Sequence, residues 1–320
     1  MDFRLSLLCV ALCLFFSCNS DDSPIMSELA TDYLNEVLDI MEENSINKYT
    51  IDWSDFRAKV FEKAANAQSI PETYDGIREA LIMLEDNHSI YYQPGGSRIT
   101  VALKCEDQTL AFPQLPSNIG YVKINAFSGS SNSTAAISFA AQIQNQIQSQ
   151  DHDEMIGWIV DLRNNGGGNM WPMIAGIGPI LGEGVAGYFI QPDNYEYSWG
   201  YSAGASIADE EYTVTQLNDF YELLIPNPEV AVLLNGGVAS SGEVMAISFI
   251  NRPNTRSFGA PTCGLSTSNT MFTLSDNARL FLTTAYLADR NKNQFGGEVA
   301  PDVMMGNQAA LQSAIEWIEE

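Results

Sequence analysis

The feature that most constrains this chain is an apolar run that breaks at glycines and leads into a helix. It occurs at residues 156–162, before Gly166-Gly167-Gly168, and again at residues 230–234, before Gly236-Gly237. A short apolar run bounded by turn residues is typical of a buried strand, and strands that alternate with helices form an α/β core. The sequence therefore predicts an α/β protein.

The second glycine break leads to Ser240 at the start of a predicted helix. A hydroxyl on a sharp strand-to-helix turn is accessible, and the first free N–H groups of the helix lie beside it to stabilise negative charge. Ser240-x-x-Glu243 also matches a capping box, in which the two side chains only satisfy free N–H groups. The turn alone leaves both interpretations open.

The first break, at Gly166–Gly168, predicts exposed backbone N–H groups that suit an anion or an oxyanion. It lacks the Gly-Lys-Ser/Thr ending of a nucleotide-binding P-loop, so that function is not supported. Asp161 and Arg163 precede the glycines, and we expect them to fix this turn rather than to touch substrate.

The rest of the chain predicts a small bundle of three N-terminal helices followed by the α/β core. Apolar residues recur at helical spacing over 26–41, and capping residues open two more helices at Asp52 and Ser69. Further elements are expected as strands at 119–124, 272–274 and 279–286 and as helices at 134–147, from 171, at 241–250 and at the C-terminus. Residues 193–219 show no clear period and are expected to form a surface excursion, either part of a substrate cleft or a plain insertion.

Composition excludes some partners. Of 320 residues, 45% are hydrophobic, which is enough for a large core, and 15 basic against 40 acidic residues give a net charge of −25. Such a charge repels nucleic acid and anionic membrane surfaces, so no nucleic-acid partner is expected. With two histidines and no ligand spacing, no metal site is expected, and nothing calls for a cofactor.

The N-terminus predicts export. Residues 1–18 combine Arg4 with an apolar run that is too short to cross a bilayer, and they form a signal segment that ends in Ser17-Cys18. This ending resembles a bacterial lipobox, which implies lipidation of Cys18 and an acidic tether over 19–25. We expect an outer-membrane or cell-surface lipoprotein that meets the membrane only through this lipid; an ordinary signal and a periplasmic location are the alternative.

The two remaining cysteines of the mature chain, Cys105 and Cys263, form either one disulfide or two buried free thiols.

Four sequence blocks resemble peptidase family S41, the C-terminal-processing and tricorn-like serine peptidases. They are Asp161-Leu162-Arg163-x-Asn165-x-Gly167-Gly168, Ala239-Ser240-x-x-Glu243, Gly259-x-Pro261-Thr262-x-Gly264 and Pro301-Asp302. The resemblance implies a crotonase-like (ClpP-like) β/α core over residues 96–320 behind a helical domain at 26–95. It further implies hydrolysis of a peptide or protein substrate with Ser240 as the nucleophile.

The same resemblance distinguishes two catalytic arrangements. Leu265 stands where the processing peptidases carry a lysine base, so a Ser–Lys dyad is excluded. The tricorn-like arrangement takes its base from a motif that Asp86-Asn87-His88-Ser89 matches, which implies His88 as the base. It implies Glu298 as the group that orients the imidazole, directly or through a hydroxyl relay for which Ser89 and Asn87 are candidates.

The resemblance also implies an oxyanion hole made by the N–H group of Ser241 with that of Gly167 or Gly168. About 25 residues separate Gln93 from Ile119, too few for an inserted PDZ domain. The alternative function is a catalytically weak binding module for a peptide or a hydrophobic ligand; an acyl-CoA enzyme of the crotonase type fits less well, because of the acidic charge and the export signal.

Overall fold

The computed structural model describes residues 25–101, 105–110 and 115–320. The predicted signal segment, the lipidation site Cys18 and all of the 19–25 tether except Ile25 lie outside the described residues. None of the described helices is both long enough and apolar enough to cross a membrane.

The centre of the molecule is a five-stranded sheet in which all pairs are parallel, with the order β14-β10-β9-β4-β3. This confirms the predicted α/β core. The strands are β3 (Ile119–Lys123), β4 (Gly157–Asp161), β9 (Glu229–Leu234), β10 (Thr255–Gly259) and β14 (Val303–Met304).

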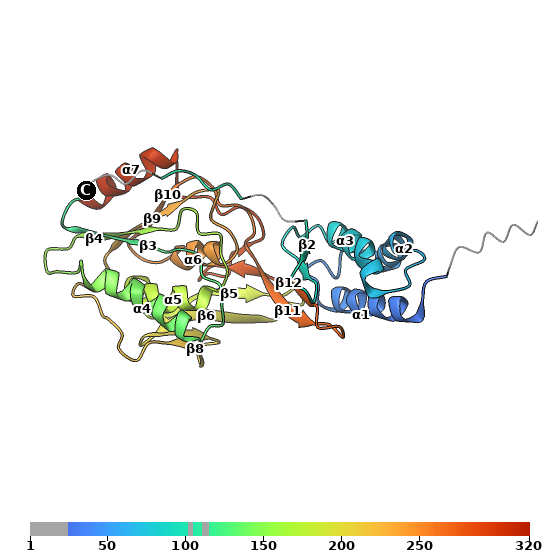
Figure 1. The fold of residues 1–320 in the computed structure, drawn as a ribbon. Helices are drawn as coiled ribbons and strands as arrows, with labels where there is room; N and C mark the ends of the chain where they lie inside the picture. The colour runs from blue at the N-terminus through green and yellow to red at the C-terminus, as the bar shows by residue number, and fades with distance from the viewer. Residues whose placement is uncertain (1–24, 102–104, 111–114) are drawn as a thin grey trace, which may run out of the picture.

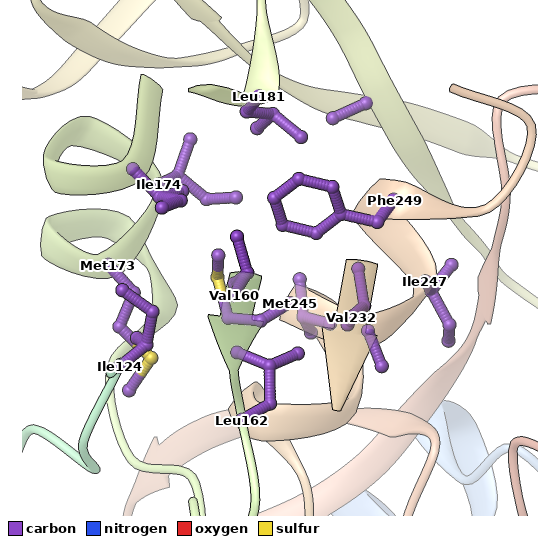
Figure 2. Packing of buried hydrophobic residues seen from close by; sticks show 14 of the residues in the cluster. Ile124, Val160, Leu162, Met173, Ile174, Leu181, Val232, Met245, Ile247 and Phe249 are labelled. Carbon is purple, nitrogen blue, oxygen red and sulfur yellow. The ribbon is translucent and has the colours of Figure 1, made fainter. Parts of the chain in front are cut away.

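Helices cover both faces of this sheet, which explains why its strands are apolar on both sides. Val232 and Leu234 of β9 face a core with α4 (Thr134–Gln148), α5 (Met170–Leu181) and α6 (Ser241–Phe249). Their neighbour Leu233 faces α7 (Asn307–Glu319) on the opposite side. Figure 1 shows α7 above the sheet and α4 to α6 below it. In Figure 2, Val160 and Val232 point into the core between α5 and α6.

A second, nine-stranded sheet is antiparallel and has the order β2-β1-β12-β5-β6-β7-β8, with β11 and β13 also paired to β12. Its strands are β1 (Ile90–Tyr92), β2 (Arg98–Thr100), β5 (Gly184–Ile190), β6 (Glu196–Ser202), β7 (Ala205–Ala208), β8 (Tyr212–Gln216), β11 (Thr267–Thr273), β12 (Arg279–Ala288) and β13 (Gln294–Phe295). The predicted hairpin at 272–286 is therefore confirmed and is longer than expected.

The prediction of an irregular excursion at 193–219 is wrong, because this segment forms β6, β7 and β8. Although the segment is rich in polar residues, one of its faces is buried. Trp199 is fully buried and donates from its indole N–H to Ser248 Oγ of α6 at 2.8 Å. Ser206 is also buried, and its hydroxyl accepts the N–H of Thr215 at 3.1 Å. The segment therefore extends the sheet instead of lying on the surface.

The N-terminal helices are α1 (Glu28–Asn44), α2 (Trp53–Lys63), the short 3-10 helix η1 (Ile70–Thr73) and α3 (Tyr74–Met83). They pack against the far end of the β11–β12 hairpin, where Leu280 and Leu282 share a core with Leu34 and Leu81. Figure 1 shows this hairpin reaching out to the helices. The boundary expected at residue 95 falls in the turn between β1 and β2, which pair with each other.

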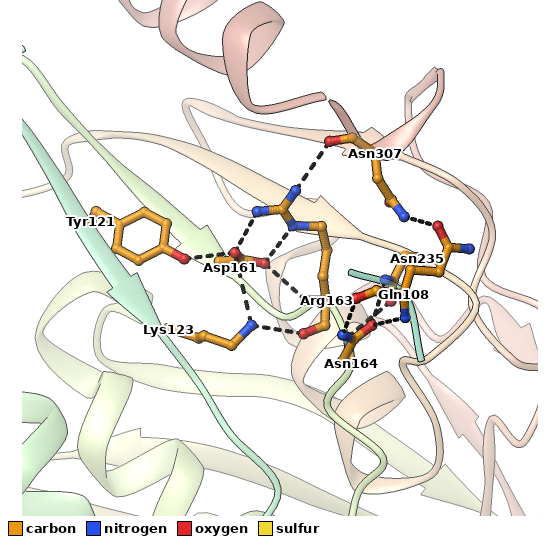
Figure 3. Close-up of polar contacts among 8 residues, drawn as sticks. All are labelled: Gln108, Tyr121, Lys123, Asp161, Arg163, Asn164, Asn235 and Asn307. Atoms are coloured by element: carbon orange, nitrogen blue, oxygen red, sulfur yellow. Dashed lines mark hydrogen bonds and ion pairs between the residues drawn. The ribbon is translucent and has the colours of Figure 1, made fainter. Parts of the chain in front are cut away.

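A buried ion pair fixes the glycine turn after β4. Both oxygens of Asp161 accept hydrogen bonds from the Arg163 guanidinium, at 2.8 and 2.6 Å, and Tyr121 donates to Asp161 at 2.7 Å (Figure 3). Burial opposes ionisation, yet the hydrogen bonds and charge of Arg163 hold the pKa of Asp161 below its ordinary value. Arg163 also donates to the carbonyl of Asn307 at the start of α7. The pair therefore has the structural place that the sequence predicted.

Replacing Arg163 with methionine should leave Asp161 buried without its main counter-charge, with only Lys123 remaining at 3.9 Å. We expect a loss of about 3–5 kcal/mol in the free energy of unfolding, measured by urea denaturation. Lys63→Met is the matched control, because Lys63 forms a solvent-exposed ion pair with Glu79 at 3.9 Å, and it should change little. Equal effects of the two substitutions would contradict a structural role for the buried pair.

Candidate active site

Ser240 occupies the turn between β9 and α6 with a strained backbone. Its φ is 53° and its ψ is −119°, a conformation that residues with a side chain rarely adopt. The N–H of Ser240 donates to Glu243 Oε2 at 2.9 Å, one turn into the helix. The glutamate of the predicted capping box therefore holds the turn, and the Ser240 hydroxyl bonds elsewhere.

Glu243 is fully buried and accepts hydrogen bonds from several donors. Besides the N–H of Ser240, it accepts the Thr262 hydroxyl at 2.6 Å and the N–H of Gly264 at 2.9 Å. Burial raises the pKa of Glu243 to about 7, although these hydrogen bonds act in the opposite direction. The side chain thereby ties the Ser240 turn to the segment 262–264.

His88 lies directly beside this serine. Its Nε2 is 3.0 Å from Ser240 Oγ, which confirms the expectation that two residues 152 positions apart meet in space. Asp86 forms the turn that carries the ring, since its carboxylate accepts the N–H groups of His88 and Ser89 at 3.0 and 2.8 Å. The Asp86–Ser89 motif therefore acts as a folded unit that presents the imidazole.

The other ring nitrogen of His88 meets a residue that the sequence did not single out. Nδ1 lies 2.8 Å from Thr267 Oγ1, at the start of β11. Glu298, the expected partner, is exposed and forms no hydrogen bond within the described part of the chain. The relay candidates are not at Nδ1 either: Ser89 Oγ donates to Asp86 at 2.6 Å, and Asn87 has no hydrogen bond to the ring among the described residues.

Strand β11 holds His88 at a second point, because Asn269 donates from its side-chain amide to the His88 carbonyl at 2.9 Å. The register of β11 against β12 shifts between Ser268 and Asn269. A bulge of this kind re-aims side chains, and its position cannot be recognised in an alternating polar strand. Thr267 lies only two positions after Leu265, the position of the lysine base in the processing peptidases. That proximity is the sequence signal by which Thr267 could have been found.

Burial controls the charge of His88. The side chain is 8% exposed, and loss of solvation lowers its pKa to about 4, against a weaker opposing effect of Asp86. The imidazole is therefore neutral at neutral pH and is able to accept a proton. When Nδ1–H donates to Thr267, the lone pair of Nε2 faces the Ser240 hydroxyl.

The glycine turn after β4 lies against the nucleophile turn. Gly167 has a φ of 94°, and a Cβ there would lie 2.6 Å from the carbonyl oxygen of Ala239 and 2.9 Å from Ser240 Cβ. Only glycine fits this contact. Ser241 Oγ donates to the Gly168 carbonyl at 2.7 Å, which joins the two turns directly. The structure thus brings all three predicted oxyanion residues beside Ser240.

The N–H groups of these residues differ in their availability. That of Gly167 already donates to Asn165 Oδ1 at 3.0 Å. Those of Gly168 and Ser241 have no hydrogen-bond partner among the described residues. Of the two combinations that the sequence left open, the pair Ser241 and Gly168 is therefore the one that is free to receive an anion. In the described ranges, no group of His, Cys, Asp and Glu side chains is arranged to hold a metal ion.

Cys105 and Cys263 form a disulfide with a Cα–Cα distance of 5.3 Å, which decides between the two predicted states. Cys263 lies within the segment that contacts Glu243, and its N–H donates to Val238 at 2.8 Å. Beyond Cys105, Gln108 exchanges two hydrogen bonds with Asn164, next to the glycine turn. The disulfide thus holds the segment 105–110 against the glycine turn after β4 and against the segment that supports the Ser240 turn.

Comparison with known proteins agrees with this geometry. A family model of peptidase family S41 matches residues 118–305, and the chain belongs to this family. It is 26% identical over 289 residues to a nisin-resistance protein of Lactococcus lactis subsp. lactis, across 90% of this chain and 86% of that protein.

Two solved structures share the fold. A lipoprotein from Streptococcus agalactiae aligns with a TM-score of 0.70 at 23% identity, over 92% of this chain and 97% of the other. The photosystem II D1 C-terminal processing protease aligns with a TM-score of 0.57 at 15% identity, over 91% and 97%. These similarities confirm the predicted S41 fold, and the chain spans nearly the whole of both structures.

The first prediction from the site concerns pH. Because the folded pKa of His88, about 4, lies below its ordinary 6.5, the neutral base persists to lower pH. As the pH is lowered, the rate of fluorophosphonate labelling should therefore stay high and then fall with a midpoint near pH 4, where His88 becomes protonated. A midpoint near 6.5 would show a solvated histidine, and one near 7 would report Glu243 instead.

The same shift affects stability. Between about pH 6.5 and 4 the unfolded chain binds a proton at His88 that the folded chain refuses, so the contribution of His88 to the free energy of unfolding falls as the pH falls through this window. The raised pKa of Glu243 acts in the opposite direction, so the contribution of His88 is measured as the difference between the wild type and His88→Gln. His88→Gln cannot titrate and should lose less stability there. Circular dichroism at each pH shows whether labelling fails before the fold does.

The second prediction concerns the disulfide. The paired variant Cys105→Ser with Cys263→Ser should lose about 2–5 kcal/mol of unfolding free energy, because the bond closes a long loop. Labelling of Ser240 should also slow, since the Cys263 segment supports Glu243. Reductant should slow the wild type and leave the double variant unchanged. Equal slowing of both would exclude the disulfide as the cause.

Proposed function

We propose that this S41 protein is an exported or surface-anchored serine endopeptidase. Ser240 is the nucleophile, His88 the general base, and Thr267 the residue that orients the imidazole. The observation that carries this proposal is the continuous contact from Ser240 Oγ through the imidazole to Thr267 Oγ1, at 3.0 and 2.8 Å. A strained serine backbone that a buried glutamate holds in place adds to it.

The reaction follows from these contacts. Ser240 Oγ attacks the peptide carbonyl while Nε2 of His88 takes the hydroxyl proton. The carbonyl oxygen becomes negative beside the N–H groups of Ser241 and Gly168. His88 then returns the proton to the leaving amine, and an acyl-enzyme remains on Ser240. Water, deprotonated by the same imidazole, releases the acid product and restores the serine.

Thr267 replaces the carboxylate that the sequence suggested at Nδ1. As the acceptor of Nδ1–H it fixes the ring in the tautomer whose Nε2 is free. Being neutral, it stabilises the imidazolium less than a carboxylate would, and Asp86 contributes only at a distance. Glu298 therefore has no assigned role in the proposed chemistry.

Two similarities support export: a lipoprotein shares the fold, and the Lactococcus lactis relative is a nisin-resistance protein. We propose small exported peptides as the substrate class, with nisin as the first to test. Mass spectrometry of nisin and of unmodified control peptides, before and after incubation, identifies any bond that is cut.

Covalent labelling by a fluorophosphonate tests the proposed catalytic residues. Ser240→Ala and His88→Ala should lower the labelling rate by about 10³-fold or more. Thr267→Val keeps the shape but removes the acceptor, and it should lower the rate about 10- to 100-fold, while Thr267→Ser should restore it. Glu298→Gln should stay within about twofold of the wild type, since the wild-type side chain forms no hydrogen bond with the ring.

The alternative function is a binding module for a peptide or a hydrophobic ligand, favoured by the lack of a carboxylate at Nδ1 among the described residues. Failure of the folded wild type to react would support it. If Glu298→Gln abolished labelling while Thr267→Val did not, Glu298 would be the orienting residue, as the sequence suggested.

A further inference from the structure

A cavity lies outside the catalytic residues, since its lining includes none of Ser240, His88 and Thr267. Its volume is about 350 Å³, and it is lined by the C-terminal end of α6, the outer part of β10 and residues 299–302. Buried apolar side chains such as Val232, Leu234 and Phe249 form its inner wall. Strand β14 pairs with β10 only at Phe258 and Gly259, so no strand covers the part of β10 before them on this side.

Arg252 supplies a buried cation to this cavity. The residue is 7% exposed, and two of its guanidinium nitrogens are fully engaged with the protein. Nε donates to the carbonyls of Ile180 and Leu181 at the end of α5, and Nη1 donates to two carbonyls and to Thr255 Oγ1 at 2.9 Å. These bonds account for a structural role of the residue.

The third nitrogen, Nη2, has no hydrogen-bond partner in the described part of the chain. Two buried side-chain atoms there lack a partner, Arg290 Nε and Asn307 Oδ1. Because Nη2 is not among these buried atoms, it has some accessible surface, and because Arg252 lines the cavity we infer that Nη2 faces it. A donor that can serve an external ligand is thus present inside it.

The charge of Arg252 is not compensated by the protein. Burial and, to a lesser degree, the neighbouring cation Arg290 together lower its pKa to about 10. The guanidinium nevertheless remains charged at neutral pH. In a chain with a net charge of −25, a buried arginine beside a half-buried one, neither in an ion pair with a described carboxylate, is unusual, because buried charges are normally paired. An anionic group from outside would supply the missing pair.

The other charged group of the cavity is Asp302. Its Oδ2 accepts the N–H and the hydroxyl of Ser257, both at 2.8 Å, and Oδ1 has no partner among the described residues. Arg252 bonds to Thr255 and Asp302 to Ser257, two positions apart on β10. Two residues of extended chain span about 7 Å, so the two positions on β10 that Arg252 and Asp302 contact are roughly the length of a dipeptide apart.

We propose that this cavity binds a short zwitterionic peptide of about two residues with apolar side chains. Its carboxylate bonds to Arg252, its ammonium group lies by Asp302, and its side chain packs on the wall of Phe249 and Val232. A simple inorganic anion would bond only to Arg252, and an apolar ligand would contact only the apolar wall of the cavity. The site is separate from the chemistry at Ser240, so it stands whether or not the protein is a peptidase.

Binding of Leu-Leu to Ser240→Ala protein, which prevents its hydrolysis, tests the site by calorimetry. N-acetyl-Leu-Leu lacks the ammonium group and Leu-Leu amide lacks the carboxylate, and each should bind at least tenfold more weakly. Methyl resonances of Ile250 and Val299, at the cavity, should shift on binding, while that of Leu265, near the catalytic turn, should not.

Two substitutions locate the ligand without disturbing the fold. Ala300→Trp fills the exposed rim of the cavity and should reduce affinity at least tenfold. Ala309→Trp places the same side chain on an exposed position of α7, on the opposite face of the sheet, and should have no effect. Equal binding of all three peptides, binding unchanged by Ala300→Trp, or shifts only at Leu265 would each overturn the proposal.

Discussion

Parallel pairing of β4 with β9 is the constraint on which the site depends. With Asp161 opposite Leu233, both strands end at the same edge of the sheet, and their glycine turns emerge side by side. Ala239 N–H then donates to the Asn165 carbonyl at 2.9 Å, and a Cβ on Gly242 would lie 2.2 Å from the same oxygen. The close backbone approach that forms the nucleophile turn therefore follows from the order of two central strands.

The base reaches this edge from the other sheet. His88 follows α3, and β11 holds it through Thr267 and Asn269. The β11–β12 hairpin thus has two roles. Its far end completes the core of the N-terminal helices, and the start of β11 orients the imidazole. Loosening the N-terminal helical region would therefore loosen the base, although none of the helices α1 to α3 contributes a catalytic group.

The sequence predicted those elements whose formation depends on residues close together in the chain. The buried strands, the capped helices and the motifs around Ser240 and His88 carry their signals within a few residues. Thr267, the strands at 196–216 and the cavity at Arg252 depend on register and on contacts between distant segments. A threonine in a polar strand looks the same whether it faces water or an imidazole. The resemblance implies Glu298 from its place before the Pro301-Asp302 block, and that place in the sequence does not determine where the side chain lies.

Burial affects the two ionisable groups of the site in opposite directions, and this fits one mechanism. It keeps His88 neutral, with a pKa near 4, which makes the imidazole a weak base in the resting protein. In the transition state, however, the imidazolium forms together with an oxyanion a few ångströms away. In a poorly solvated site these opposite charges stabilise each other strongly. The low resting pKa thus opposes a lone imidazolium far more than the ion pair that catalysis requires.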